Sequence, residues 1–138
     1  MKKFAIVLLV LVFAIPSFAQ KITEDKAKES VKSILSKITT DYGKVNHDEG
    51  YYELEYKLVY NGKVVSEAEK KVKQASNVKP GQLLLDFEKE LKSKIKSASI
   101  ESAKFDKDDN EWEVKLYLPG MDIDEINVDA STGEIVAD

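Results

Sequence analysis

The stretch Tyr52-Glu53-Leu54-Glu55-Tyr56-Lys57-Leu58 decides the fold, because it returns sixty residues later as Trp112-Glu113-Val114-Lys115-Leu116-Tyr117-Leu118. In both stretches apolar side chains alternate with mostly charged ones, which is the pattern of a strand with one buried face. The apolar positions carry over between the two copies, whereas most residue types differ. A repeat of such long period indicates that one structural unit is used twice.

An amphipathic helix is predicted before each of these strands. The first begins at Ile22-Thr23-Glu24-Asp25, where Thr23 can cap the helix and two acids lie in the positive first turn. It should end near residues 39–41, with Gly43 beyond it. The buried stripes have helical spacing and consist of Ala27, Val31, Ile34, Leu35 and Ile38 in the first helix, and of Leu84, Phe87, Leu91, Ile95 and Ala98 in the second.

The remaining segments predict antiparallel strands joined by short turns, and one of these strands is expected at residues 100–106. Asn61-Gly62 is a strong signal for a two-residue hairpin turn. Residues 66–75 have helical spacing, but the repeat aligns them with a strand, so we expect a strand as far as about Val72. The sequence therefore predicts the α+β class, with two helix-plus-antiparallel-meander units, at 20–76 and 77–138, in which each helix covers its own sheet.

The first nineteen residues predict a secretory signal peptide. Lys2 and Lys3 precede an apolar run, Pro16 breaks it, and Ser17-Phe18-Ala19 offers small residues at a cleavage site. The run is short for a membrane span, which disfavours the alternative of an uncleaved anchor. We expect a mature chain that starts at Gln20 and is periplasmic or secreted, with no membrane anchor.

Charge and composition exclude several classes of partner. The chain has no cysteine, so no disulfide can stabilise its fold and no cysteine-linked lipid can anchor it to a membrane. Without residues 1–19, which include two lysines, the formal net charge of −4 becomes −6. Acidic and basic residues are mixed along the chain and form no basic stripe, so the sequence indicates neither nucleic-acid nor anionic-membrane binding.

No set of residues in the sequence indicates catalysis. His47 is the only histidine and is expected in a polar turn, with no cysteine or second histidine to complete a zinc or nucleophilic site. The segment Asp106–Asn110 resembles the start of a calcium loop, but Glu111 replaces the required glycine. A hairpin turn is the simpler interpretation, and a weak surface calcium site is the alternative. We predict no enzyme, no cofactor and no metal centre.

The end of the chain, Val128-Asp129-Ala130-Ser131-Thr132-Gly133-Glu134-Ile135, resembles the closing hairpin of PepSY domains, which end in V-D-A-x-T-G-E followed by an apolar residue. The resemblance covers residues 82–138, and residues 22–27 are similar to the family's helix start. The first unit is a degenerate copy, since Glu69-Lys70-Lys71-Val72-Lys73 stands where this ending is expected. The resemblance implies an exported inhibitor or regulator of peptidases, similar to tandem-module β-lactamase inhibitors, without catalytic residues.

The function that we expect is protein binding outside the cytoplasm, with a peptidase or other hydrolase as partner. Strand alternation places Tyr51, Val59 and Tyr117 on the outer faces, and Met121 follows in a turn. Exposed tyrosines among charged residues are typical of protein-binding surfaces. The alternative is a small-ligand carrier with an apolar pocket between helix and sheet. That pocket would be lined by Tyr52, Tyr56, Leu91 and Trp112.

Overall fold

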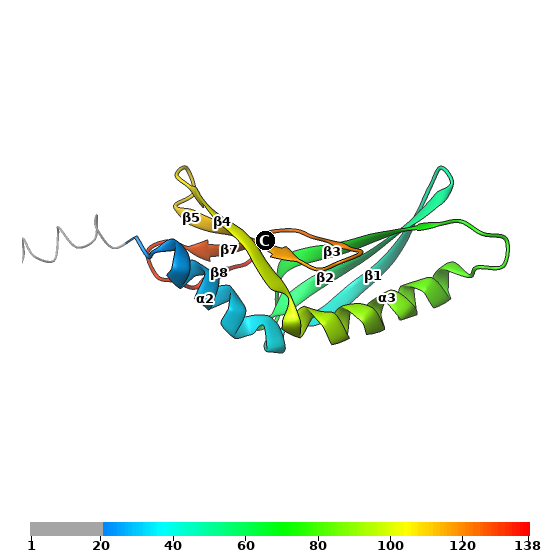
Figure 1. The fold of residues 1–138 in the computed structure, drawn as a ribbon, viewed down its shortest axis with the longest axis horizontal. Helices are drawn as coiled ribbons and strands as arrows, with labels where there is room; N and C mark the ends of the chain where they lie inside the picture. The colour runs from blue at the N-terminus through cyan, green and yellow to red at the C-terminus, as the bar shows by residue number, and fades with distance from the viewer. Residues whose placement is uncertain (1–20) are drawn as a thin grey trace, which may run out of the picture.

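The computed structural model describes residues 21–138 as two α-helices and two four-stranded antiparallel sheets (Figure 1). The α+β prediction is confirmed, and the signal-peptide prediction, at residues 1–19, lies outside the described residues. The sheets have the strand orders β1-β2-β3-β6 and β4-β5-β7-β8. The elements are α2 (Glu24–Ile34), β1 (Thr39–Asp48), β2 (Tyr51–Tyr60), β3 (Lys63–Lys73), α3 (Pro80–Lys94), β4 (Ser99–Asp106), β5 (Glu111–Tyr117), β6 (Asp122–Ile123), β7 (Ile126–Asp129) and β8 (Ile135–Val136).

The sixty-residue repeat is visible in the positions where elements end and begin. Each α-helix runs into a 3₁₀ turn, Leu35–Lys37 in the first half and Ile95–Ser97 in the second. The turn before each central strand has a residue with positive φ, Gly50 at 76° and Asn110 at 54°. β7 pairs with β5 as β3 pairs with β2, so the two halves share one topology.

Two segments test the strand predictions most closely. β3 extends to Lys73, which confirms the strand predicted for residues 66–72. The expected helix end near residues 39–41 is wrong, because the helical segment stops at Lys37 and β1, which includes Gly43, occupies residues 39–48. A Cβ atom at position 43 would lie 2.5 Å from the ring of Tyr56, so glycine lets β1 pass close to that ring. His47 consequently lies in a strand and not in a turn.

Each helix covers the sheet of the other half of the chain. α2 packs on β4, β5 and β7, and α3 packs on β1 and β2 (Figure 1). The expectation that each helix covers its own sheet is therefore wrong. Only Ile38 and Ala98 separate the 3₁₀ turns from the strands that follow. One residue is too short for a loop that reverses the chain direction. The strand therefore continues away from the helix that precedes it and does not lie beneath that helix (Figure 1).

The rings and polar groups of β2 hold α3 against the first sheet. The hydroxyl of Tyr56 donates to the carbonyl oxygen of Leu84 at 3.0 Å, and the rings of Tyr56 and Phe87 lie 5.8 Å apart. Phe87 and Leu91 are buried in this interface. The second helix is thus bonded and packed to a sheet that precedes it in the chain.

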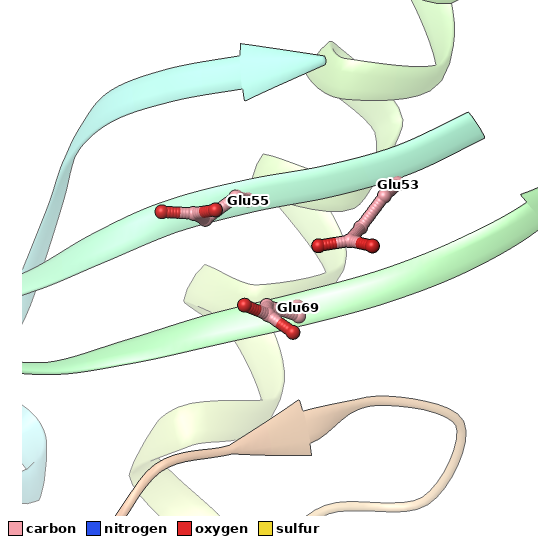
Figure 2. A group of neighbouring side chains, drawn as sticks. All are labelled: Glu53, Glu55 and Glu69. Atoms are coloured by element: carbon pink, nitrogen blue, oxygen red, sulfur yellow. The ribbon is translucent and has the colours of Figure 1, made fainter. Parts of the chain in front are cut away.

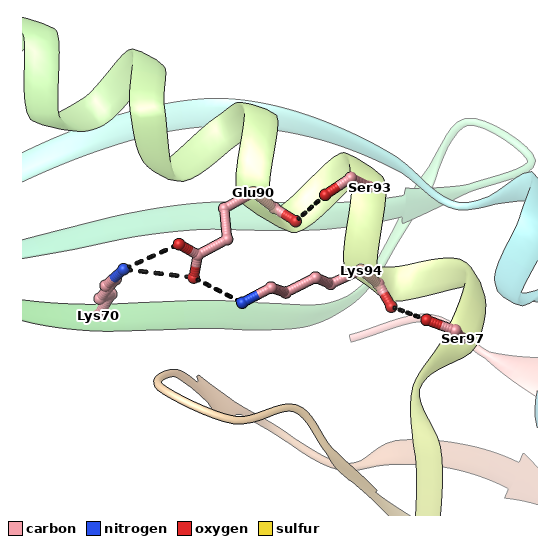
Figure 3. Close-up of polar contacts among 5 residues, drawn as sticks. All are labelled: Lys70, Glu90, Ser93, Lys94 and Ser97. Carbon is pink, nitrogen blue, oxygen red and sulfur yellow. Dashed lines mark hydrogen bonds and ion pairs between the residues drawn. The ribbon is translucent and has the colours of Figure 1, made fainter.

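An ion pair between β3 and α3 adds to this interface (Figure 3). The ammonium group of Lys70 lies 3.2 and 3.1 Å from the two carboxylate oxygens of Glu90, and that of Lys94 lies 3.7 Å from the same carboxylate. Ser93 and Ser97 donate to carbonyl oxygens one turn earlier in the helix. All three charged side chains are partly buried or half-exposed, so the contribution of the pair to stability is small, about 0–1 kcal/mol.

The N-terminal segment is tied to the second sheet in the same way. The indole of Trp112 donates to the carbonyl oxygen of Ile22 at 3.0 Å, and the backbone N–H of Ile22 donates to Ala130 at 2.8 Å. β6 links the halves in a further way: it belongs to the second half of the chain but pairs with β3 of the first half. The buried side chains of both halves consequently form one continuous apolar cluster.

Candidate functional site

The sheet faces that carry no helix form one side of the molecule. Both helices lie along the other side, where they cover the buried alternate residues of β2 and β5 (Figure 1). The hairpin turns of β1-β2 and β4-β5 stand at opposite ends and project away from the helices (Figure 1). The uncovered side is therefore the candidate binding surface.

No helix in residues 21–138 is long and apolar enough to cross a membrane.

Tyr117 and Met121 come together on this molecule in one shallow groove. The groove has a volume of about 430 Å³ and is bordered by Leu118, Lys71 and Asp122, among others. Tyr117 is 54 % exposed, and a bridge between Leu118 and Met121 closes the turn between them. These two predicted contact residues thus lie beside charged side chains of β3 and β6.

Tyr51 and Val59 lie outside this groove. Tyr51 is 47 % exposed at the hairpin end of β2, between Asp48 and Lys73 in register. Val59 is partly buried at the other end of the same strand. They lie eight steps apart along the strand, which corresponds to about 26 Å. The four predicted residues therefore do not form a single contact patch.

Three glutamates form a partly buried acidic cluster on the uncovered face (Figure 2). Glu53 and Glu55 come from β2 and Glu69 from β3, and carboxylate oxygens of all three lie within 4.8 Å of one another. Burial raises the pKa of Glu69, and the charges of Glu53 and Glu55, followed by Asp124 and Asp122, raise it further. Carboxylate oxygens are ligands for hard cations such as Ca²⁺, so these residues could hold one.

The raised pKa of Glu69 predicts a stabilising substitution. Because folding raises this pKa, ionised Glu69 disfavours the folded state at neutral pH, and this cost disappears as pH falls through the raised pKa. Glu69→Gln should raise the melting temperature at pH 7, and the gain should vanish below the ordinary pKa of 4.5. Thermal unfolding from pH 3 to 8 measures this, with Glu49→Gln in the exposed turn as the control. Equal melting temperatures for wild type and Glu69→Gln at pH 7 would contradict the prediction.

The carboxylates of Asp106 and Asp129 stabilise turns. Asp106 accepts hydrogen bonds from the backbone N–H groups of Asp108 and Asp109, which confirms the hairpin turn predicted there. Asp129 accepts from the backbone of Ser131 at 2.7 Å and of Thr132 at 3.0 Å. One oxygen of each carboxylate, Oδ1, thus accepts from two backbone N–H groups, as is usual for aspartate in turns.

The residues proposed to line a carrier pocket are not brought together. Tyr56 and Leu91 pack with α3 on the first sheet, and Trp112 packs with the N-terminal segment on the second. Tyr52 contacts the ring of His47 edge-on at 5.1 Å. A depression of about 450 Å³ lies instead between α2, the β2-β3 turn and the C-terminal segment. It is open to solvent and includes none of these residues.

Sequence reasoning missed the glutamate cluster, although part of its signal was present. Glu53 and Glu55 are recognisable as neighbours on one face of a strand. Their pairing with Glu69 depends on the register between β2 and β3, which an irregularity near Val65 shifts by one residue.

No model of a known protein family, no curated protein and no solved structure matches this chain.

Proposed function

We propose that this chain is an exported, non-enzymatic, PepSY-like protein-binding module that inhibits or regulates an extracytoplasmic hydrolase. One observation carries the proposal. Tyr117 exposes 54 % of its surface beside Met121, in a groove with charged side chains at its rim. A large amphipathic ring surrounded by polar residues has the composition of a protein-binding hot spot.

The surroundings of Tyr117 support this role. The ring stands at the end of β5, opposite Ser99 in register, on a sheet whose inner side is fixed by buried side chains. Gly120 has a φ of 83°, a conformation that favours glycine and keeps the turn to Met121 tight. Because the ring is held by a rigid element, little conformational entropy is lost when a partner binds it.

Tyr117→Ala tests this site directly. The proposal predicts that the affinity for the partner falls at least tenfold, because truncation of a hot-spot tyrosine costs about 2 kcal/mol or more. Leu85→Ala is the matched control, since Leu85 is 53 % exposed but lies on α3. The measurement is a capture experiment with the chain from Gln20 on extracytoplasmic extract, followed by titration of the captured protein after purification.

The same titration decides the regulatory part of the proposal. If the captured protein is a hydrolase, its activity should fall or change when the wild-type chain is added, and Tyr117→Ala should shift the effective concentration at least tenfold. A Tyr117→Ala variant that is folded and binds like wild type would refute the site. A captured hydrolase whose activity is unaffected would refute the regulatory role and leave binding intact.

A further inference from the structure

The uncovered sides of the two sheets collect most of the excess negative charge of the described chain. Residues that face each other in register lie on the same side of a sheet, so the pairing defines this surface. We call it the open face. Its charged members are Asp41, Lys44, Asp48, Glu53, Glu55, Lys57, Glu67, Glu69, Lys71, Lys73 and Asp122 on the first sheet, and Lys104, Asp106, Glu111, Glu113, Lys115 and Asp129 on the second.

The open face thus holds eleven carboxylates and six lysines. Elsewhere in residues 21–138 the numbers of acidic and basic residues are nearly equal. The excess of acidic residues on one side is therefore a property of the fold. It is hard to see in the sequence, where acidic and basic residues are interspersed as far as Lys115.

The lysines on the open face neutralise its acidic groups only in part: Lys57 forms ion pairs with Glu55 and Glu67, and other acidic groups lie beside one another. Glu69 and Asp122 are direct cross-strand partners, which is unfavourable for like charges. Glu111 lies in register between Asp106 and Asp129. Burial raises the pKa of Glu111, and Asp109, Asp106 and Asp129 raise it further. Glu69, Asp122 and Glu111 form no ion pair within residues 21–138, so they would gain from a positive charge on a partner.

We infer that the open face is the docking surface of the protein and that its partner presents a basic protein surface. This inference rests on the proposed binding function and names the chemistry of the partner. Within residues 21–138 no helix covers this face, and this, together with its acidic excess, points to an external basic partner. A second copy of the chain would bring like charges together, so self-association through this face is disfavoured.

The two exposed tyrosines give this electrostatic surface its contact residues. Tyr51 pairs with Asp48 and Lys73 in the first sheet, and Tyr117 pairs with Ser99 in the second, so both belong to the open face. Charge complementarity mainly raises the association rate and selects the partner, whereas buried aromatic anchors determine the lifetime of the complex. Binding should therefore be fast at low salt and should slow down as salt is added.

Charge reversal on the open face tests the inference. Glu53→Lys with Glu69→Lys changes the net charge of the acidic cluster, and Glu53→Gln with Glu69→Gln is a milder pair that retains the side-chain shape. Glu29→Lys with Asp86→Lys is the matched control, because both residues are exposed on the helices and the change in net charge is the same. The probe is total extracytoplasmic protein of the source organism, captured with and without EDTA.

The inference predicts capture of a basic protein by wild type and by the helix control. For that purified protein, the association rate should fall about tenfold with the Lys pair, and by a smaller factor with the Gln pair or with added salt. Loss of capture with Tyr117→Ala but not with either open-face pair would overturn the inference and leave the proposed function standing. An acidic captured protein, or capture abolished by EDTA, would also overturn it. Capture of nothing, or capture insensitive to all these variants, would overturn both proposals.

Discussion

Neither half of the chain should fold on its own. Residues 20–76 contain α2 and the strands β1 to β3, but the apolar stripe of α2 packs on β4, β5 and β7 in the other half. The buried face of β2, with Leu54, Tyr56 and Leu58, would lose its cover in α3. A fragment of this size has a thin core even when it is complete. We expect circular dichroism of each separate half to show no cooperative thermal transition.

Mixing the two halves should restore the native fold. Complementation is expected because the interface between the halves is the main hydrophobic core, so the folded fraction should rise with the concentration of both fragments. The full-length chain at the same concentration is the control. A half that melts cooperatively by itself would indicate that its helix can cover its own sheet. That result would contradict the arrangement in which each helix covers the sheet of the other half.

Phe87→Ala should destabilise the whole protein by about 3–5 kcal/mol. The ring is 2 % exposed and packs against Tyr56, so its removal leaves a cavity between α3 and the first sheet. Small domains are stable by only about 5–15 kcal/mol, so this loss brings the protein close to unfolding. Urea unfolding followed by Trp112 fluorescence measures the effect. Because Trp112 lies on the other sheet, its signal also reports whether the two sheets unfold together.

Leu85→Ala on the same helix is the control for Phe87→Ala. Leu85 is 53 % exposed, and a change at such a site should remain within about 0.5 kcal/mol. A Phe87→Ala variant whose Trp112 transition coincides with that of wild type would show that the second sheet is independent of α3. That result would contradict the single shared core.

The repeat and the alternation of apolar residues were enough to predict the fold class and the strand at residues 66–72. The fold class follows from local periodicity, which a sequence displays directly, whereas the strand at residues 66–72 follows from the repeat, against the helical spacing of that segment. β1 could have been found as well, since β4 was expected at residues 100–106 and the repeat maps it onto this segment. The apolar content of residues 39–48 is low because β1 is an edge strand, and this hid it.

Periodicity could not predict that each helix covers the sheet of the other half, nor could it predict the glutamate cluster. Both helices have similar apolar stripes, so the pattern does not say which sheet each one covers. Counting outward from the Asn61-Gly62 turn would place Glu55 opposite Ala68. The irregularity between Leu58 and Val59 shifts the register, and Glu55 faces Glu69 instead. A shift by one residue changes the face of every side chain beyond it.

The central claim is that each sheet carries the helix of the other half, which leaves the opposite faces open. Cysteine cross-linking tests it most directly, because the chain has no cysteine of its own. Lys70→Cys with Glu90→Cys joins β3 to α3, where the native side chains form an ion pair. The control is Lys70→Cys with Ser30→Cys, the equivalent position of α2 in the repeat.

Ser30 borders a depression with Tyr60 and Lys63. Lys63 and Lys70 lie seven steps apart along β3, which corresponds to about 23 Å. A short bismaleimide, applied to the folded monomer at low concentration, should therefore join positions 70 and 90 within one chain. It should leave positions 30 and 70 unlinked. The reverse result, with a link from 30 to 70 and none from 70 to 90, would place α2 on the first sheet and contradict the account.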